Sequence, residues 1–210
     1  GRRPLPGIVA AKPPHLLTNN AQSKYPSFEE LIIDVGLPPA EVAELVRPGD
    51  TVMIVHTDIT RATPNDRILP VILQELESLG VARKDISLLN GLGTHRPQTE
   101  VELRAMLGDW IVENYCCLQH DCNDDQNLVS LGETAHGHPV RINRFYMEAD
   151  VRILTGFIEP HFFAGFSGGP KAVLPSLAGR ESVFTNHGLR MIAHPNSRWG
   201  VTEGNPIWEE

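Results

Sequence analysis

Hydrophobic and polar positions follow two different patterns along the chain. Residues 51–57 and 150–155 are nearly continuous apolar runs, typical of strands buried on both faces of a parallel sheet, and residues 85–89 form a similar short run. Residues 65–79 instead carry apolar side chains on one helical stripe, and Gly80 follows with the backbone freedom that a helix terminus uses. This strand, helix, strand order predicts a right-handed crossover and a parallel pair of strands.

The remaining segments have weaker patterns. Thr99 and Glu102 form a capping-box pattern, which predicts a helix over residues 99–107, and residues 111–118 are predicted as the next strand. The other expected elements are helices over 27–35 and 38–46, a loop over 119–137, and an edge strand or hairpin arm over 137–143. Together the elements predict an α/β fold with a mainly parallel, doubly wound, Rossmann-like sheet that has helices on both faces.

Length and charge limit the possible partners. The 210 residues suffice for a full hydrophobic core, with residues 51–210 as the main domain and residues 1–50 as an N-terminal extension packed on it. A net charge of -8 argues against a nucleic-acid footprint, which needs a clustered basic surface. No apolar run approaches the ~20 residues that span a bilayer, and the start of the chain has no signal-peptide pattern. We expect a cytoplasmic protein that binds a small molecule, not nucleic acid or a membrane.

Cysteine usage gives no sign of a structural scaffold. The chain has three cysteines, Cys116, Cys117 and Cys122, which is an odd number without paired C-x-x-C spacing. Neither a disulfide framework nor a structural zinc site is favoured, and reduced thiols are expected.

The candidate chemistry lies in three loops that follow predicted strands. These loops are residues 58–61, 91–96 and 159–171. In open α/β sheets ligands bind beyond the carboxyl ends of the parallel strands, so the topology predicts that the loops converge on one site.

The third loop carries the strongest signal, because it combines His161, a glycine-rich turn and Lys171. It is not a phosphate-binding P-loop, since Pro170 separates the turn from the lysine. Gly168 and Gly169 would still let backbone N–H groups approach an anion closely. A lysine in such an uncharged stretch can have a lowered pKa and act as a nucleophile or attachment point.

Each candidate also has a purely structural explanation. His95 sits on a constrained loop, where a histidine is as readily structural as functional. Asp58 and Arg61 can pair at the surface, Lys171 can be solvated, and His187 can cap or pack.

Five short motifs in register resemble the N-terminal domain of the nickel-pincer-dependent lactate racemase family. They are Asp58-x-Thr-Arg61, Gly93-Thr-His95-Arg, Glu159-Pro-His161, Gly165-x-Ser-Gly-Gly-x-Lys171 and Asn186-His187. Members of this family racemise or epimerise 2-hydroxy acids such as lactate, by reversible hydride transfer to a nickel pincer nucleotide derived from nicotinic acid mononucleotide. The resemblance therefore makes residues 51–210 a cofactor-binding catalytic domain. It also implies that cofactor-synthesis proteins are partners.

The resemblance also implies roles for individual residues. Lys171 would hold the cofactor covalently, His187 would be the protein ligand of nickel, and His95 and His161 would be the acid/base pair. Arg61 is the candidate for holding a carboxylate or phosphate, and Asp58 would orient Arg61 or accept a cofactor hydroxyl. Gly168 and Gly169 would contact the cofactor.

The chain departs from the family pattern in three respects. Ile59 stands where the family often has histidine, and Ser176 stands where glycine is usual. The second domain of the family, which closes over the cofactor, is not found in this sequence. Two alternatives remain open: a non-catalytic domain that binds a pyridine nucleotide, and a zinc-dependent hydrolase that uses the histidines and Asp58.

Overall fold

A four-stranded parallel sheet forms the centre of the molecule. The computed structural model describes residues 8–10, 32–34 and 45–210. Strands β3 (Val52–Thr57), β4 (Ile86–Gly91), β5 (Cys116–Gln119) and β8 (Val151–Leu154) lie in the order β5-β4-β3-β8. All three neighbouring pairs are parallel. The predicted doubly wound α/β fold is confirmed, and so are the strands expected near residues 51–57, 85–89 and 150–155.

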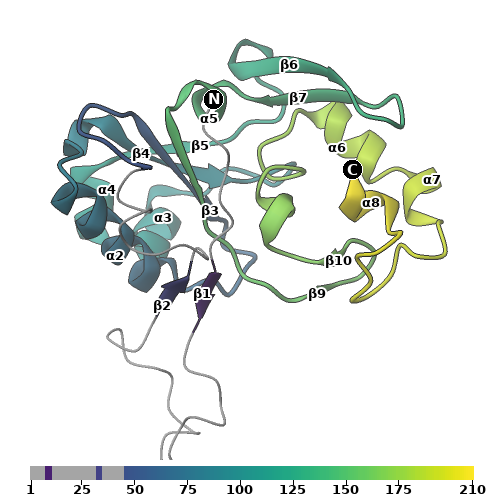
Figure 1. Cartoon of the computed structure of the whole chain (residues 1–210), viewed down its shortest axis with the longest axis horizontal. Coiled ribbons are helices and arrows are strands. Elements are labelled where there is room, and N and C mark those ends of the chain that lie inside the picture. The colour runs from purple at the N-terminus through teal and green to yellow at the C-terminus, as the bar shows by residue number, and fades with distance from the viewer. Residues whose placement is uncertain (1–7, 11–31, 35–44) are drawn as a thin grey trace, which may run out of the picture.

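One face of the sheet is covered by helices α2 (Asn65–Ser78), α3 (Glu100–Leu107) and α4 (Asp109–Asn114), as Figure 1 shows. The stripe predicted on α2 packs Ile68, Leu69 and Ile72 against Val52 and Ile54 of β3. Helix α3 begins at Thr99 with the complete capping box. The apolar stripe and the cap therefore account for this layer.

The other face is covered by later parts of the chain. Strands β6 (Leu128–Glu133) and β7 (Pro139–Asn143) form an antiparallel hairpin, followed by α5 (Arg144–Glu148). Helix α6 (Arg180–Asn186) packs beside the hairpin (Figure 1). A second buried cluster joins Met53, Val55 and Leu89 of the sheet to Ile142 and Leu177. The alternating side chains of β3 thus serve both layers.

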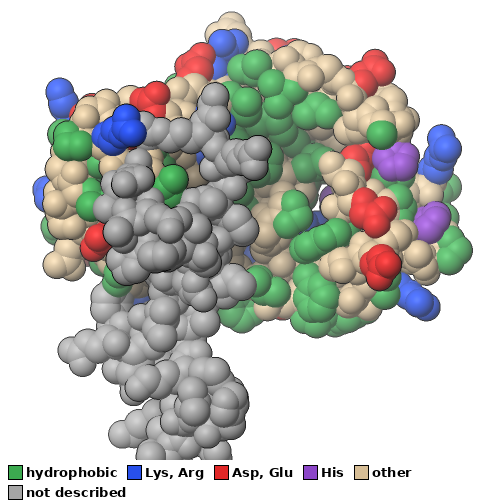
Figure 2. Space-filling model, viewed as in Figure 1, with side chains coloured by type: hydrophobic (Ala, Val, Ile, Leu, Met, Phe, Trp, Pro, Cys, Tyr) green, Lys and Arg blue, Asp and Glu red, His purple; other side chains and the backbone are tan. Residues whose placement is uncertain are grey.

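Short elements complete the C-terminal half, drawn in green to yellow in Figure 1. They are β9 (Pro160–His161), β10 (Gly165–Phe166), the 3-10 helix η5 (Gly169–Ala172), α7 (Leu189–Ile192) and α8 (Pro206–Glu209). Pro170 lies in the first turn of η5, as its position after two glycines predicts. Figure 2 shows acidic side chains and histidines side by side over the region of α6, α7 and α8.

The order of the strands creates one topological switch point. From β3 the chain moves outward through β4 to β5, and then returns across the sheet to β8 on the other side of β3. The carboxyl ends of β3 and β8 therefore diverge into loops on opposite faces, the arrangement that opens a ligand crevice.

Two sequence predictions in the middle of the chain are wrong. The strand predicted over residues 111–118 is helix α4 followed by the shorter strand β5, because so short an apolar run does not distinguish a helix from a strand. The loop predicted over residues 119–137 contains β6. Most of β6 is exposed, so no buried face leaves an alternating pattern in the sequence.

The N-terminal predictions are only partly tested. Ile32–Asp34 is strand β2, paired antiparallel with β1 (Ile8–Ala10), so the helix predicted over residues 27–35 is wrong there. Consecutive isoleucines favour a strand, which explains the difference. The helix predicted over 38–46 lies almost wholly outside the described residues, and the division at residue 50 stays a prediction. Among residues 8–10, 32–34 and 45–210, no helix has the length and apolar character that crossing a bilayer requires.

Candidate active site

A cavity of about 260 Å³ opens at the switch point of the sheet. Its walls come from the loops after β3, β4 and β8, so the three loops predicted to converge do so. The lining includes most of the residues singled out in the sequence: Asp58, Arg61, His95, His161, Gly168, Lys171 and His187. Gly169 is not part of the lining, and its backbone instead begins η5.

Asp58 and His95 form a hydrogen-bonded pair at one side of the cavity. Nδ1 of His95 lies 2.5 Å from Oδ2 of Asp58. The other carboxylate oxygen, Oδ1, accepts bonds from the backbone N–H and the hydroxyl of Thr60, at 3.1 and 2.6 Å. A carboxylate accepts only, so Nδ1 of His95 carries a proton and Nε2 is left free. The partner of Asp58 is thus His95, not Arg61.

His161 has the opposite proton placement when it is neutral. Its Nδ1 accepts a hydrogen bond from the backbone N–H of Ala164 at 3.3 Å, so the ring proton lies on Nε2. Burial lowers the pKa of His161 to about 4, and the positive charges of Lys171 and Arg61 act in the same direction. His161 is therefore a neutral donor at pH 7, whereas the neutral form of His95 presents an acceptor at Nε2.

Lys171 and His187 meet on the opposite side of the cavity. Nζ of Lys171 lies 3.4 Å from Nε2 of His187. Burial and the charge of Arg61 lower the pKa of Lys171 to about 8. The pKa of His187 falls to about 4, first through burial and then through the charge of Lys171. About a tenth of the Lys171 amine is then neutral at pH 7, far more than for an ordinary lysine.

Phe163 fills the space between two of the histidines. Its ring stands edge-on to His161 at 4.7 Å and to His187 at 5.1 Å between ring centroids. Such edge contacts hold both imidazoles in place without adding a charge. Sequence reasoning missed Phe163, because nothing in the sequence distinguishes it from Phe162, its neighbour in the turn between β9 and β10.

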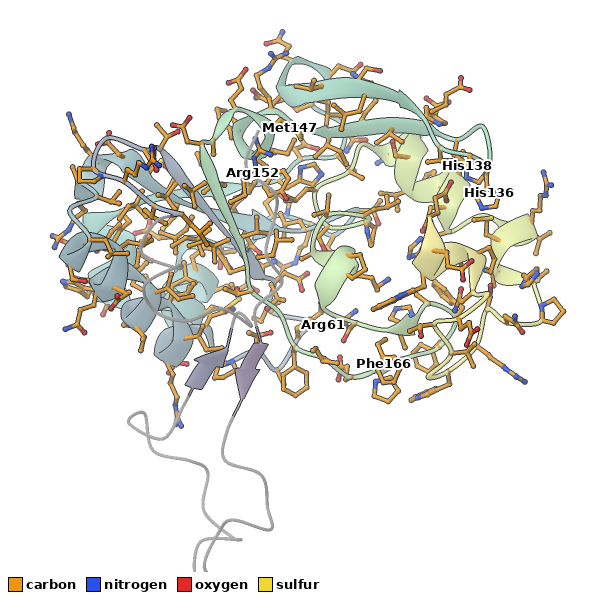
Figure 3. The ribbon with its side chains drawn as sticks, in the orientation of Figure 1. Arg61, His136, His138, Met147, Arg152 and Phe166 are labelled. Atoms are coloured by element: carbon orange, nitrogen blue, oxygen red, sulfur yellow. The ribbon has the colours of Figure 1, made fainter. Side chains whose placement is uncertain are left out.

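Arg61 is a partly exposed cation of the site. Its side chain is 30% exposed, and Nε lies 3.8 Å from Oε1 of Glu159. Figure 3 labels Arg61 beside the segment that leads into β9. At that distance and exposure the ion pair is weak. The guanidinium therefore remains free to bind an anion in the cavity through its planar fork.

Ser176 forms hydrogen bonds with both the loop of Lys171 and the loop of Gly93. Its hydroxyl donates to the carbonyl of Lys171 at 2.7 Å, and its own carbonyl accepts from the N–H of Gly93 at 2.9 Å. The side chain that departs from the family pattern therefore supports the backbone of Lys171. Ile59 is the other residue that departs from the family pattern. It is 49% exposed, and its backbone N–H donates to Oε1 of Gln98 at 3.0 Å.

Four of the other histidines also lie outside the cavity lining. His120 is buried between Asn143 and the carbonyl of Ala178. His136 and His138 lie at the tip of the β6–β7 hairpin, where Figure 3 labels them. His194 accepts a bond from the backbone of Asn196. These four have structural surroundings.

A zinc hydrolase is not favoured by the arrangement of side chains. Within the ranges that the structure describes, no group of three His, Cys, Asp or Glu side chains is placed to hold a metal ion. Catalytic zinc is normally held by three protein ligands. A metal that needs only one ligand from this chain is compatible with His187.

Comparisons with known proteins identify the family of the chain. Residues 16–200 match the family model for the lactate racemase N-terminal domain. A lactate racemase of Thermoanaerobacterium thermosaccharolyticum is 37% identical over 164 residues, which are 78% of this chain and 38% of that protein. A lactate racemase of Lactiplantibacillus plantarum is 36% identical over 181 residues, or 86% of this chain and 42% of that protein. The chain thus spans about two fifths of the length of these relatives.

Solved structures show the same similarity. The lactate racemase apoprotein of T. thermosaccharolyticum superposes with a TM-score of 0.75 at 37% identity, covering 80% of this chain and 40% of that chain. A protein of Thermotoga maritima superposes with a TM-score of 0.65 at 24% identity, covering 81% of this chain and 43% of that one, and supports the fold alone.

Proposed function

The chain belongs to the lactate racemase N-terminal domain family, and we propose that it bears the cofactor and the acid/base pair of a 2-hydroxy acid racemase or epimerase. The observation that carries the proposal is the shared cavity of Lys171, His187, His95 and His161. The cofactor in this proposal is the nickel pincer nucleotide.

The residues of the cavity fit such a group. Lys171 offers a buried amine that is partly neutral at pH 7, which suits covalent attachment. His187 offers an imidazole nitrogen, a good nickel ligand, directly beside that amine. Arg61 supplies positive charge for a phosphate or a carboxylate. The cavity volume of about 260 Å³ is close to the lower end of small-molecule sites.

When bound, the cofactor would supply an electron-poor ring that reversibly accepts a hydride from C2 of the substrate. The residues of this chain would move the proton of the substrate hydroxyl. In this proposal His95 accepts that proton at Nε2, because the Asp58 carboxylate holds its Nδ1–H. The carboxylate also stabilises the imidazolium that results.

His161 would serve the opposite enantiomer. To act as the base, His161 would take the hydroxyl proton at Nε2 with its own ring proton on Nδ1, and the resulting imidazolium would return the proton from Nε2 in the reverse direction. An attached Lys171 has no positive charge, so one of the causes that lower the pKa of His161 disappears on attachment. The pKa of His161 would then rise, which favours its use as a base.

Arg61 would bind the carboxylate that every 2-hydroxy acid carries. Its planar guanidinium can hold a carboxylate through two parallel hydrogen bonds. Arg61 lines the same cavity as His95 and His161, so a carboxylate bound to it would hold the substrate within that cavity. The choice among 2-hydroxy acids is not part of the proposal, although lactate is the first to test.

The experiment is the conversion of enantiopure lactate by the protein produced together with cofactor-synthesis proteins. Formation of the opposite enantiomer, lost in His161→Gln and retained in His136→Gln, is the expected result. His136 is the matched control, because it is an exposed histidine outside the cavity. A loaded protein that converts no 2-hydroxy acid would instead favour the non-catalytic, nucleotide-binding alternative.

A further inference from the structure

We propose that Asn186 and Glu210 are positioning residues, which fix the imidazole of His187 with its proton on Nδ1 and its lone pair on Nε2. The part of this inference that concerns nickel rests on the proposed function. The part that concerns the imidazole rests on the hydrogen bonds alone.

The direction of the Asn186 amide is set by two acceptors. Its Nδ2 lies 2.7 Å from Oε2 of Glu210 and 3.3 Å from the carbonyl oxygen of Ile207. A carboxylate and a backbone carbonyl can only accept, so the NH₂ group must face them. The side chain of Asn186 is almost completely buried, and no water can replace these partners at low cost.

The amide direction then determines the proton position on His187. Oδ1 of Asn186 faces Nδ1 of His187 at 2.6 Å. An amide oxygen can only accept, so Nδ1 must be the protonated nitrogen of the ring. Nε2 keeps its lone pair and points to Nζ of Lys171, which can donate to it. The same lone pair is what a metal ion requires.

Glu210 is itself held from the other side. Oε1 accepts bonds from the hydroxyl of Thr134 at 2.5 Å and from Nδ1 of His138 at 2.7 Å. Only 1% of its side chain is exposed. Figure 3 shows His138 at the tip of the β6–β7 hairpin, on the side of α8. The hairpin thus holds the carboxylate that directs Asn186.

Helix α8 and Glu210, which directly follows it, provide the two acceptors for Asn186, and the helix is fixed to the site by Asn205. Oδ1 of Asn205 caps the helix at the N–H of Ile207, at 3.1 Å. Its Nδ2 donates to the carbonyl of Phe163 at 2.9 Å. The helix is therefore tied to the same loop that places Phe163 against the His187 ring. Loss of a ligand-orienting partner of this kind typically lowers metal affinity by about 10–100-fold.

His120 is an internal control, because its hydrogen bonds require the ring proton on the other nitrogen, Nε2. Its Nε2 donates to the carbonyl of Ala178 at 3.0 Å, and its Nδ1 accepts from Nδ2 of Asn143 at 3.1 Å. The direction of the Asn143 amide is also fixed, because its Oδ1 accepts from the N–H of Phe145 at 3.0 Å. His120 must therefore carry its proton on Nε2.

The first test is nuclear magnetic resonance of protein labelled with ¹⁵N in the histidine rings, before any cofactor is added. The His187 signals are identified by their loss in His187→Gln. We expect His187 to be protonated on Nδ1 and His120 on Nε2 in the same spectrum. His187 protonated on Nε2 in the unaltered protein would overturn the proposal without any further variant.

Variants then test the two positioning residues separately. Asn186→Leu and Glu210→Leu are expected to lose the exclusive Nδ1–H form of His187 and to leave His120 unchanged. Glu210→Gln is the conservative control, because it keeps an oxygen for the Asn186 amide, and it should retain the Nδ1–H form. An unchanged His187 in a folded Asn186→Leu protein contradicts the role of Asn186, and the same result in Glu210→Leu contradicts that of Glu210.

A second readout separates this inference from the proposed function. In protein produced with cofactor-synthesis proteins, Asn186→Leu should keep the covalent addition on Lys171 but retain nickel with about 10–100-fold lower affinity. Undiminished nickel affinity in Asn186→Leu would overturn the positioning role. If the unaltered protein has no addition on Lys171, the proposed function fails, whereas the proton position on His187 still stands or falls by the spectra.

Discussion

Asp58 and His95 join a buried carboxylate to an accessible imidazole. Oδ2 and Nδ1 lie 2.5 Å apart, while the side chain of Asp58 is 4% exposed and that of His95 is 52% exposed. The carboxylate is thus protected from solvent, whereas the imidazole is accessible at the edge of the cavity. In this arrangement the carboxylate fixes the ring orientation and the position of its proton.

Replacing Asp58 by asparagine should slow racemisation strongly. Asparagine keeps the size of the side chain but can present its NH₂ group to Nδ1 of His95. The proton of the neutral ring then moves to Nε2, where no acceptor remains for the substrate. We expect a decrease in kcat of about 10²–10⁴-fold. The rate of lactate racemisation at saturating substrate gives the answer. The covalent addition on Lys171 should be unaffected, and a near-normal kcat would remove Asp58 from the mechanism.

His95→Ala and His161→Ala should each abolish turnover without preventing cofactor attachment. Each enantiomer requires its own acid/base, so loss of either imidazole stops interconversion in both directions. The check combines the racemisation rate with the mass of the protein for each variant. Normal rates in both variants would show that other groups move the proton.

The central fold could be predicted from the sequence because its signals are local. The strand β3 is apolar at almost every position, and α2 carries a regular stripe that ends at Gly80. Neither α4 nor β6 has such a signal. Helix α4 has six residues, and β6 buries only Leu128, so their identity depends on neighbours that the sequence does not reveal.

The site could be predicted in part for a similar reason. Parallel strands bring their carboxyl ends together, so the loops of Asp58, His95 and Lys171 were expected to converge. The partner of Asp58 depends on side-chain geometry and was not predictable. Glu210 is far from His187 along the chain, and only the packing of α8 brings its carboxylate to Asn186. No pattern along the chain marks such a contact.

Acid should destabilise the protein, in part through His56. This ring is completely buried, and burial lowers its pKa from 6.5 to about 4. The unfolded chain therefore binds more protons between pH 6.5 and 4, so stability is complete above pH 6.5 and falls as the pH decreases through this range. The lowered pKa values of His161 and His187 act in the same direction.

The slope of this dependence measures the contribution of His56. A single histidine of this kind changes the free energy of unfolding by about 1.4 kcal/mol per pH unit at most. Urea denaturation between pH 4 and 6.5 should therefore show a shallower slope for His56→Leu than for the unaltered protein. The exposed variant His136→Gln is the control. An equal slope for His56→Leu would mean that His56 takes up its proton in the folded state as well.

Gly165→Ala should destabilise the loop that carries His161. Gly165 has φ +76°, and a Cβ atom there would collide with the backbone carbonyl of Val201. Gly137 has φ +75° with nothing within 4 Å of such an atom, so Gly137→Ala carries the backbone cost alone. That cost is about 1–2 kcal/mol. Urea denaturation should give a larger loss for Gly165→Ala than for Gly137→Ala, and equal losses would show that the Val201 backbone moves aside freely.

The central claim is that Lys171 carries the cofactor, and the mass of the intact protein tests it most directly. The protein is produced with cofactor-synthesis proteins and measured beside Lys171→Arg and the exposed control Lys84→Arg. The account predicts one covalent addition, located on the Lys171 peptide, that is absent in Lys171→Arg and present in Lys84→Arg. An unmodified Lys171 in a protein that still racemises a 2-hydroxy acid would contradict it.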